Sequence, residues 1–290
     1  MIDISIVIPC YNQDIFLNDC LTSIVNQTNP NWEAIVVDDA SPEGNAELVA
    51  SKFRDSRVRF IRHHRNRGLG ASRNTGFRNA VNEHVVCVDF DDMLTPNFLQ
   101  KVGTAFSQGE FDCVFTDFQL FGSSKDVWKF SICDEETMTK CQWIPGPGTL
   151  MKRSLWEKVG GYSEDKIMIY NDDWDFWLGA VELGIKAFHI PEPLYLYRRA
   201  EDSLSIRGKL HDYLTREIMY SKHRSLFDLY HTGNQFLADG YQNSSLAAWN
   251  SGKRLRTVYL AVKTLRFSPK RLHMLKLAAK ALIPPFFVTL

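Results

Sequence analysis

The sequence predicts an α/β fold in which a mostly parallel central sheet is flanked by helices and followed by a helical C-terminal extension. Strand and helix signals alternate through the first 116 of the 290 residues, which is typical of a parallel sheet with helices on both faces. Beyond residue 205 nearly every segment has a helical pattern. The expected strands are 3–9, 33–38, 58–61, 84–89 and 111–116, and the expected helices are 14–27, 44–53, 70–81 and 96–107.

Each strand is marked by a run of apolar residues, and each helix by apolar residues three and four positions apart. Val85–Val88 is such a run, and it suits a strand that is buried on both faces of a sheet. Leu17, Leu21 and Ile24 show the helical spacing. The same signals predict helices at 153–159 and 173–184, a strand at 186–190 and an extended segment at 194–197.

The regular alternation stops between residues 117 and 150, where segments with Gly and Pro replace it. Long irregular stretches in a compact domain usually form binding loops or lids, so we expect this stretch to take part in ligand selection. We place the α/β domain at residues 1–205 and the helical extension at 206–290.

Charge is distributed unevenly along the chain, although the net charge is zero. Residues 251–290 carry nine Lys or Arg and no Asp or Glu, so residues 1–250 have a net charge of −9. Because the basic residues alternate with Leu, Val, Tyr and Phe, the tail resembles a basic amphipathic helix that binds an anionic membrane surface. The pattern also fits a helical cap whose apolar face packs on the rest of the chain.

Cysteine spacing and hydropathy exclude several classes of protein. The six cysteines form no C-x-x-C pair, which argues against a zinc site or a disulfide framework. The chain begins with a strand pattern instead of a basic and then a long apolar segment, so we expect no signal peptide. No stretch approaches the ~20 apolar residues of a transmembrane helix. We expect a cytoplasmic protein that contacts a membrane peripherally, if at all, and no nucleic-acid partner.

The most informative segment is Asp89-Phe90-Asp91-Asp92, which follows the apolar run of a buried strand. Ligands of parallel sheets collect beyond the carboxyl ends of the strands. Three neighbouring carboxylates repel one another, and Mg²⁺ or Mn²⁺ would relieve the repulsion while also binding phosphate oxygens. The segment therefore indicates a site for a metal-bound phosphate ester. Alternatively, Asp89 ends the strand and Asp91 or Asp92 caps the helix near Pro96.

Five segments occur in an order that is specific to one protein family. They are Ser5-Ile6-Val7-Ile8-Pro9-Cys10-Tyr11-Asn12, Val36-Val37-Asp38-Asp39-Ala40-Ser41, Asn66-Arg67-Gly68-Leu69-Gly70-Ala71-Ser72-Arg73-Asn74-Thr75-Gly76, Asp89-Phe90-Asp91-Asp92, and Gly160-Gly161-Tyr162 followed by Asp172-Asp173-Trp174-Asp175-Phe176-Trp177. With these segments the chain resembles the family 2 inverting glycosyltransferases over residues 3 to about 205. The resemblance implies their nucleotide-sugar-binding fold, known as GT-A.

The resemblance also implies which residues bind the nucleotide sugar. Asp39 would accept the imide N–H of uracil, although an N-cap or turn role is the alternative. Pro9 and Tyr11 would border the base, and Pro9 could instead only terminate its strand. The full expected set is Pro9, Tyr11, Asn12, Asp39, Asn66, Gly68, Arg73 and Asp89.

Within the glycine-rich segment, Gly68 and Gly70 could let the backbone approach a diphosphate, and Arg73 could pair with its oxygens. A dinucleotide-binding G-x-G-x-x-G motif is excluded because position 73 is Arg. The alternative for Arg73 is an exposed helical arginine.

Asp89-Phe90-Asp91-Asp92 corresponds to the D-x-D metal motif of the family, which implies a divalent cation, Mn²⁺ or Mg²⁺. Asp91 is the expected direct ligand. Asp89 would contact the ribose or a metal-bound water, and Asp92 would be either a second ligand or a group that orients the first.

Asp172 and Asp173 open a strongly apolar helix. The resemblance implies that Asp173 is the catalytic base, and that Asp172 stands where most members have Glu. An acidic helix start is also favourable through capping and the helix dipole, which is the structural alternative. A second departure is Ala200, where many relatives have a His that in some members helps to hold the metal; water could replace it.

We therefore expect inverting transfer of a sugar from a nucleotide-diphosphate donor, a UDP-sugar, to a hydroxyl of a glycan or lipid-linked acceptor in cell-surface polysaccharide synthesis. The alternative is a non-catalytic nucleotide-sugar-binding subunit of a glycan assembly complex. The departures at Asp172 and Ala200 favour that alternative, whereas the intact Asp39, Asp91 and Asp173 oppose it. A nucleotidyltransferase fits less well, because no Gly-rich, basic triphosphate loop follows the first strand.

Overall fold

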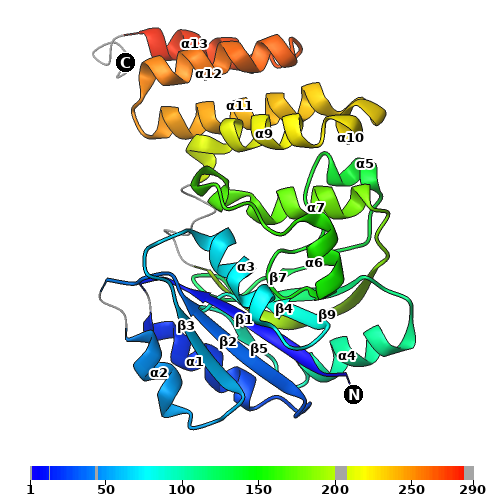
Figure 1. The fold of residues 1–290 in the computed structure, drawn as a ribbon. Coiled ribbons are helices and arrows are strands. Elements are labelled where there is room, and N and C mark those ends of the chain that lie inside the picture. Colours follow the sequence, from blue (N-terminus) through cyan, green and yellow to red (C-terminus); the bar gives the residue numbers. More distant parts are fainter. Residues whose placement is uncertain (1, 13, 43–44, 200–207, 284–290) are drawn as a thin grey trace. The chain divides into compact units, whose positions relative to one another are not determined.

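The computed structural model of the chain divides into two compact units, which are described separately (Figure 1). The residues described are 2–12, 14–42, 45–199 and 208–283. The first unit comprises residues 1–134 and 142–200, and the second comprises 135–141 and 201–290. The departure at Ala200 and the apolar end of the tail at 284–290 lie outside the described residues.

The first half of unit 1 contains four parallel strands, as the apolar runs predicted. They are β1 (Ile4–Cys10), β2 (Trp32–Asp38), β3 (Val58–Arg62) and β4 (His84–Cys87), in the order β3-β2-β1-β4. Every residue of β1 and β2 is buried, which explains their nearly continuous apolar sequence. The helices between them are α1 (Asp14–Val25), α2 (Ala46–Lys52) and α3 (Leu69–Asn79).

The second half of the sheet contains strands of both directions. β8 (Leu150–Lys152) pairs antiparallel with β4 and with β6 (Cys113–Gly122), and β9 (Ala187–Arg199) runs parallel to β6. β5 (Met93–Leu94) pairs antiparallel with β9, and β7 (Val127–Trp128) with β6. Over the described residues, the six longer strands therefore share one direction, which confirms the predicted mostly parallel sheet.

One strand of this half differs from the expectation. The strand expected at 186–190 and the extended segment at 194–197 form the single strand β9. Its pairing with β6 shifts register next to Asp117. Pro191 and Pro193 lie at this shift, and because proline lacks an N–H, the ladder is interrupted there without ending the strand.

The remaining helices of unit 1 are α4 (Phe98–Gln108), α6 (Arg153–Val159), the 3₁₀ helix η1 (Lys166–Tyr170) and α7 (Asp172–Glu182). The hydrophobic core lies between the sheet and α1, α2 and α4. Ile6, Leu21, Val36 and Phe98 are all fully buried in it. This packing fixes the strand ends from which the polar site residues extend.

Unit 2 is helical, as expected for the C-terminal extension. Its helices are α5 (Glu135–Met138), the 3₁₀ helix η2 (Lys209–His211), α9 (Asp212–Lys222), α10 (Arg224–Leu229), α11 (Gly233–Asn250), α12 (Arg254–Phe267) and α13 (His273–Leu282). The sequence did not indicate that α5 belongs here. Tyr230 donates to Glu135 at 2.9 Å, and the hydroxyls of Thr232 and Thr139 are 2.7 Å apart. Among the helices of the described residues, none has both the length and the hydropathy needed to cross a bilayer.

Candidate active site

The carboxyl ends of β1, β2 and β4 meet at one edge of the sheet, because these strands are parallel neighbours. Tyr11 and Asn12 follow β1, Asp39 follows β2, and the Asp89–Asp92 turn follows β4. The topology therefore brings these predicted residues to the same edge, where ligands of parallel sheets collect.

Asp39 is buried and binds the glycine-rich segment. Its Oδ1 accepts the backbone N–H of Arg67 at 2.8 Å and lies 2.7 Å from Nδ1 of His63, and its Oδ2 accepts the N–H of Gly68 at 2.7 Å. Gly68 has a φ of 97°, which a glycine adopts without a steric penalty. The conformation of this segment thus depends on Asp39.

The residues after β1 and β2 contact one another. Pro9 is buried in β1, Tyr11 is exposed, and the N–H of Asn12 donates to Oγ of Ser41 at 3.0 Å. Ser41 in turn donates through its hydroxyl and its N–H to Oδ1 of the buried Asp38, at 2.5 and 3.1 Å. Asp38 therefore bonds within the chain and holds the turn after β2.

Two residues of the glycine-rich segment pack against η1 and the segment before it. Asn66 accepts from Nζ of Lys166 at 3.1 Å. A Cβ added at Gly70 would lie 2.0 Å from the carbonyl oxygen of Ser163, so this glycine permits close packing of α3 on the protein itself. The sequence suggested that Gly70 lets the backbone approach a diphosphate. In the structure, Gly70 instead lets α3 approach the backbone of Ser163.

Arg73 is buried, and its guanidinium joins two of the sequence motifs. It donates to Oδ2 of Asp172 at 2.7 Å and to Oδ1 of Asp89 at 3.3 Å, with only 4% of its side chain exposed. Burial raises the pKa of Asp172 to about 7, although the charge of Arg73 opposes the rise. The alternative of an exposed helical arginine is wrong, since Arg73 links the acidic end of β4 to the first turn of α7.

The Asp89–Asp92 turn is held by two residues of β9. The Tyr195 hydroxyl accepts the Asp89 N–H at 3.2 Å and donates to Oδ2 of Asp92 at 2.7 Å. The Arg198 N–H donates to Oδ1 of Asp92 at 2.7 Å, and its Nε donates to the Asp91 carbonyl at 2.8 Å. Both oxygens of the buried Asp92 already accept bonds. Of its two expected roles, the geometry therefore favours orienting the turn over binding the metal directly.

Asp91 is the carboxylate of this turn that best suits a cation. Burial, and then the charge of Asp89, raises the pKa of Asp91 to about 6. Mg²⁺ bound with a phosphate normally takes only one or two protein carboxylates. Over the described ranges, no three His, Cys, Asp or Glu side chains converge to hold a metal by themselves. The donor set therefore fits a divalent cation that shares its ligands with a phosphate group.

Asp173 lies in the first turn of α7 and is partly exposed. Its Oδ1 accepts the N–H of Trp174 at 2.8 Å, and its Oδ2 accepts Nε2 of Gln142 at 3.1 Å. A Cβ added at Gly146 would lie 2.3 Å from Oδ2, so the backbone before β8 packs directly on this carboxylate. Since Asp172 is buried with Arg73, Asp173 is the better placed of the two acids to meet a substrate.

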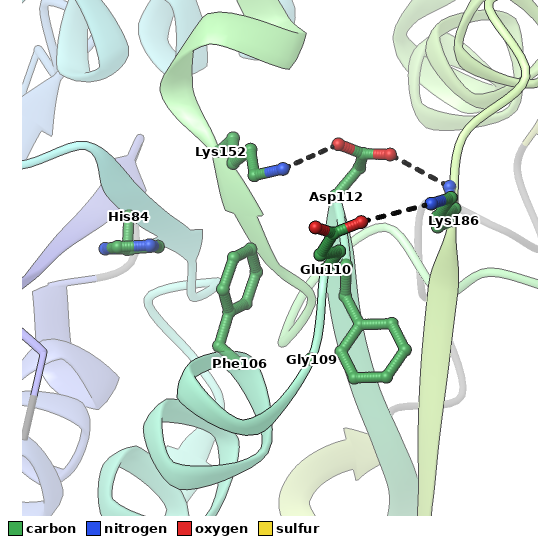
Figure 2. A pocket seen from close by; sticks show the side chains of 8 residues that line it. His84, Phe106, Gly109, Glu110, Asp112, Lys152 and Lys186 are labelled. Atoms are coloured by element: carbon green, nitrogen blue, oxygen red, sulfur yellow. Dashed lines mark hydrogen bonds and ion pairs between the residues drawn. The ribbon is translucent and has the colours of Figure 1, made fainter.

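A pocket of about 490 Å³ lies at the opposite edge of the sheet (Figure 2). It is lined by His84, Phe106, Gly109, Glu110, Phe111, Asp112, Lys152 and Lys186. Its charges are paired within the chain: Nζ of Lys152 is 2.9 Å from Oδ1 of Asp112, and Nζ of Lys186 is 3.5 Å from Oε2 of Glu110. None of the predicted site residues lines it.

Four residues that shape the site were not identified from the sequence: His63, Gln142, Tyr195 and Arg198. Three of them contact a motif from a distant part of the chain and belong to no motif themselves. Arg198 had a weak signal, because it lies two residues before the departure at Ala200.

The fold, with acidic residues gathered at one edge of its sheet, is that of a GT-A glycosyltransferase. The profile of the family described as Glycosyl transferase family 2 matches residues 5–174, which is more than half of the chain. The chain therefore belongs to glycosyl transferase family 2.

Curated bacterial proteins are similar to most of the chain. The uncharacterized glycosyltransferase EpsJ of Bacillus subtilis (strain 168) is 28% identical over 218 residues, which cover 70% of this chain and 62% of EpsJ. Glycosyltransferase GlyA of Streptococcus pneumoniae serotype 4 is 26% identical over 231 residues, 70% of this chain but 31% of GlyA. The UDP-Glc:alpha-D-GlcNAc-diphosphoundecaprenol beta-1,3-glucosyltransferase WfgD of Escherichia coli is 24% identical over 206 residues, 70% of this chain and 79% of WfgD. The chain thus spans less than two thirds of EpsJ and of GlyA.

Two solved structures show the same fold. TarS 1–349 of S. aureus in complex with UDP-GlcNAc has a TM-score of 0.65 and 14% identity, covering 96% of this chain and 89% of that one. The mannosyltransferase PcManGT from Pyrobaculum calidifontis, in complex with GDP-Man and Mn²⁺, has a TM-score of 0.59 and 18% identity, covering 97% and 88%. The expected fold class is confirmed by this likeness.

Proposed function

We propose that the chain transfers a sugar, with inversion at the anomeric carbon, from a nucleotide-diphosphate donor to a hydroxyl group. The observation that carries this proposal is the Arg73 guanidinium, which contacts Asp172 at 2.7 Å and Asp89 at 3.3 Å. Catalysis requires the donor phosphates and the acceptor hydroxyl to meet at one place. The bridge supports one site containing both the acidic turn and the first turn of α7.

Asp173 acts as the general base in this proposal and takes the proton of the acceptor hydroxyl on the face opposite the diphosphate. The bonds from Gln142 and from the Trp174 N–H orient its carboxylate. The acceptor oxygen forms its bond to the anomeric carbon as the bond to the diphosphate oxygen breaks, and positive charge develops on the sugar ring. Asp172, paired with Arg73, positions the start of α7.

Asp91 would hold Mn²⁺ or Mg²⁺, Asp89 would contact the ribose or a metal-bound water, and Asp92 would orient the turn. When bound, the cation neutralises the charge of the departing diphosphate as a Lewis acid. The Mn²⁺ and GDP-Man in the PcManGT structure support a divalent cation beside a nucleotide sugar in this fold.

A UDP-sugar is the proposed donor. A carboxylate has about four acceptor sites, and Asp39 uses three of them for His63, Arg67 and Gly68, which leaves one for the imide N–H of uracil. Pro9, Tyr11 and Asn12 would border the base, with Asn66 and Gly68 near the phosphates. The UDP-GlcNAc in the TarS structure supports this choice.

The proposed acceptor is a hydroxyl of a glycan or of a lipid-linked sugar in cell-surface polysaccharide synthesis. The name of WfgD describes transfer to a sugar on diphosphoundecaprenol, which supports an acceptor of this class. Such an acceptor would place the enzyme at the cytoplasmic face of the membrane, with the C-terminal tail in peripheral contact with anionic lipids.

A panel of nucleotide sugars tests the proposal, with donor hydrolysis and thermal stabilisation measured with and without Mn²⁺ or Mg²⁺. A bound donor at 100 times its Kd adds about 2.7 kcal/mol to the free energy of unfolding. We expect one UDP-sugar to stabilise the protein and to be hydrolysed slowly when metal is present. If a donor stabilises the protein but is neither hydrolysed nor transferred to any glycan tested, the chain is instead a non-catalytic nucleotide-sugar-binding subunit. Failure of every donor to bind would overturn both.

A further inference from the structure

The helical hairpin α12–α13 of unit 2 exposes apolar side chains on its outer side. On α12, Leu255, Tyr259 and Val262 are between 52 and 83% exposed. Their spacing of four and three places them on one face of the helix. Thr257, Leu260 and Thr264 are fully buried on the opposite side, where α11 packs.

Helix α13 repeats this arrangement. Leu272, Leu275 and Leu282, at its start and along it, are between 52 and 65% exposed. Met274 and Ala278 are buried and pack on Ala261 of α12. A surface helix usually buries one apolar face and exposes a polar one. The additional exposed apolar stripes on α12 and α13 therefore indicate a binding surface.

The two exposed stripes lie on the same side of the hairpin. Arg254, at the start of α12, donates from Nε to the Ala281 carbonyl at 2.9 Å and from Nη2 to the Lys280 carbonyl at 3.0 Å, so the helices are antiparallel. At about 100° per residue, the α12 stripe is rotated by about 165° from the side of Thr257, Leu260 and Thr264, which faces α11. Because the two helices are antiparallel, the α13 stripe lies on the same side of the hairpin as the α12 stripe. Both stripes therefore face away from α11, which packs on the other side of α12 (Figure 1).

The charged side chains of the hairpin are all positive. Residues 251–283 contain nine Lys or Arg and no Asp or Glu. Arg254, Arg256 and Arg271 bond to α13, to the Leu210 carbonyl and to α11. The other six form no ion pair with a carboxylate in the part of the chain that the structure describes: Lys253, Lys263, Arg266, Lys270, Lys276 and Lys280. A second copy of this face would bring like charges together, whereas a layer of anionic headgroups would neutralise them.

We propose that α12–α13 docks on an anionic lipid surface, with Leu255, Tyr259, Val262, Leu272, Leu275 and Leu282 entering the headgroup boundary and the lysines and arginines beside them binding lipid phosphates. An amphipathic element lies in the membrane plane in this way, and long basic side chains reach the headgroups while their stems stay apolar. The inference deepens the proposed function, since a lipid-linked acceptor lies in such a membrane, but it is argued from unit 2 alone.

Co-sedimentation of the full chain with lipid vesicles tests the inference. We expect binding to vesicles of phosphatidylglycerol and phosphatidylcholine at low salt, and weak binding to phosphatidylcholine alone or at high salt. The apolar variant Val262→Ser/Leu275→Ser should bind at least about 10²-fold more weakly. The charge variant Lys263→Gln/Lys276→Gln/Lys280→Gln should also bind vesicles about 10²-fold more weakly, because each basic residue near the surface contributes to the affinity and three are removed.

The matched controls change exposed residues elsewhere. Leu229→Ser/Leu246→Ser alters two exposed leucines of α10 and α11, and Lys125→Gln/Lys129→Gln/Lys158→Gln alters three exposed lysines of unit 1. Both should bind vesicles like the unchanged chain. Equal binding by the hairpin variants and their controls, or no binding by the unchanged chain, overturns the inference. A dimer that only the apolar variant dissociates, without vesicle binding, would assign the face to a second copy.

Donor hydrolysis in the absence of vesicles separates this inference from the proposed function. The hairpin variants should hydrolyse donor like the unchanged chain, because they alter nothing at the sheet edge. If the unchanged chain hydrolyses donor but does not bind vesicles, only the docking inference is overturned. Vesicle binding without hydrolysis would remove only the proposed reaction.

Discussion

The two edges of the sheet compensate their charges differently. At the amino edge, Asp112 accepts bonds from Nζ of Lys152 and from the N–H of Lys186, both at 2.9 Å. Burial raises the pKa of Asp112, but these bonds have the larger effect and lower the pKa below the usual 3.8. At the carboxyl edge, burial and then the neighbouring carboxylates raise the pKa of Asp91 and Asp92. One edge is neutralised within the chain, and the other concentrates negative charge.

The difference shows that a hollow by itself does not locate the site. The amino-edge pocket of about 490 Å³ contains acids and bases that satisfy one another. The carboxyl edge contains carboxylates with raised pKa values beside the buried guanidinium of Arg73, and such groups cluster where a ligand supplies the missing charge. We therefore expect substitutions at the two edges to have very different effects.

The largest expected effect is that of Asp91→Asn at the carboxyl edge. Transfer should fall by about 10³-fold or more, because a Lewis-acidic cation contributes several kcal/mol to the transition state. Turnover at saturating Mn²⁺ measures the loss of transfer. An unchanged circular dichroism spectrum shows that the variant is folded. Full turnover by the unchanged chain in excess chelator would contradict a metal-dependent reaction.

The next effect is that of Asp173→Asn, which should lower the transfer rate by ~10²–10⁴ with little change in donor affinity. The reason is that the acceptor proton loses its base while the donor site is unaltered. Rates and donor Kd should be measured in parallel for Asp172→Asn. If Asp172→Asn lowers the rate in this way and Asp173→Asn does not, the base is the other carboxylate.

Asp172→Asn should act mainly on stability, lowering the free energy of unfolding by about 3 kcal/mol, because it leaves a buried guanidinium with one partner. Urea denaturation measures the change. The double substitution Arg73→Met/Asp172→Leu is the matched control, and it should be less destabilised than Asp172→Asn since no buried charge is left unpaired at this pair. Equal stability of Asp172→Asn and the unchanged chain would show that the bridge is not important for folding.

The smallest effect is expected at the amino edge, where Asp112→Asn should cost less than about 1 kcal/mol and leave turnover unchanged, because the Asp112–Lys152 pair is partly exposed. The folded pKa of Asp112 is lowered from 3.8, so its stabilisation is complete above pH 3.8 and is lost as the pH falls through the folded value. The difference between the two proteins should be measurable at neutral pH and absent at strongly acidic pH. A loss of turnover would show that this edge takes part in the reaction.

Residues next to strand ends could be located from the sequence, whereas their partners could not. Asp39 and Asp91 each follow a strand of the predicted parallel sheet, and parallel neighbouring strands end together. The burial of Arg73 was missed because its partner Asp172 is 99 residues away, and Asp92 is fixed by Tyr195, 103 residues away. No local pattern reports such pairings, which depend on how the second half of the sheet packs.

The tail shows the same limit on a smaller scale. Its sequence fitted either a membrane-binding helix or a packed cap. The structure divides the apolar residues of α12 between two faces, with Leu260 buried against α11 and Val262 exposed. Helical spacing predicts that each face exists, but only the packing decides which of the two is covered.

The position of β8 has a consequence for synthesis of the chain. β8 lies between β4 and β6, so the edge of β4 has no neighbour on that side until residues 150–152 emerge, 63 residues after β4 ends at Cys87. At about 5–20 residues per second, this edge would stay open for roughly 3–13 s. Open apolar edges pair with other chains, and we expect nascent chains stalled before residue 150 to associate with chaperones more than longer ones. Equal chaperone association at both lengths would show that another segment covers β4 in the meantime.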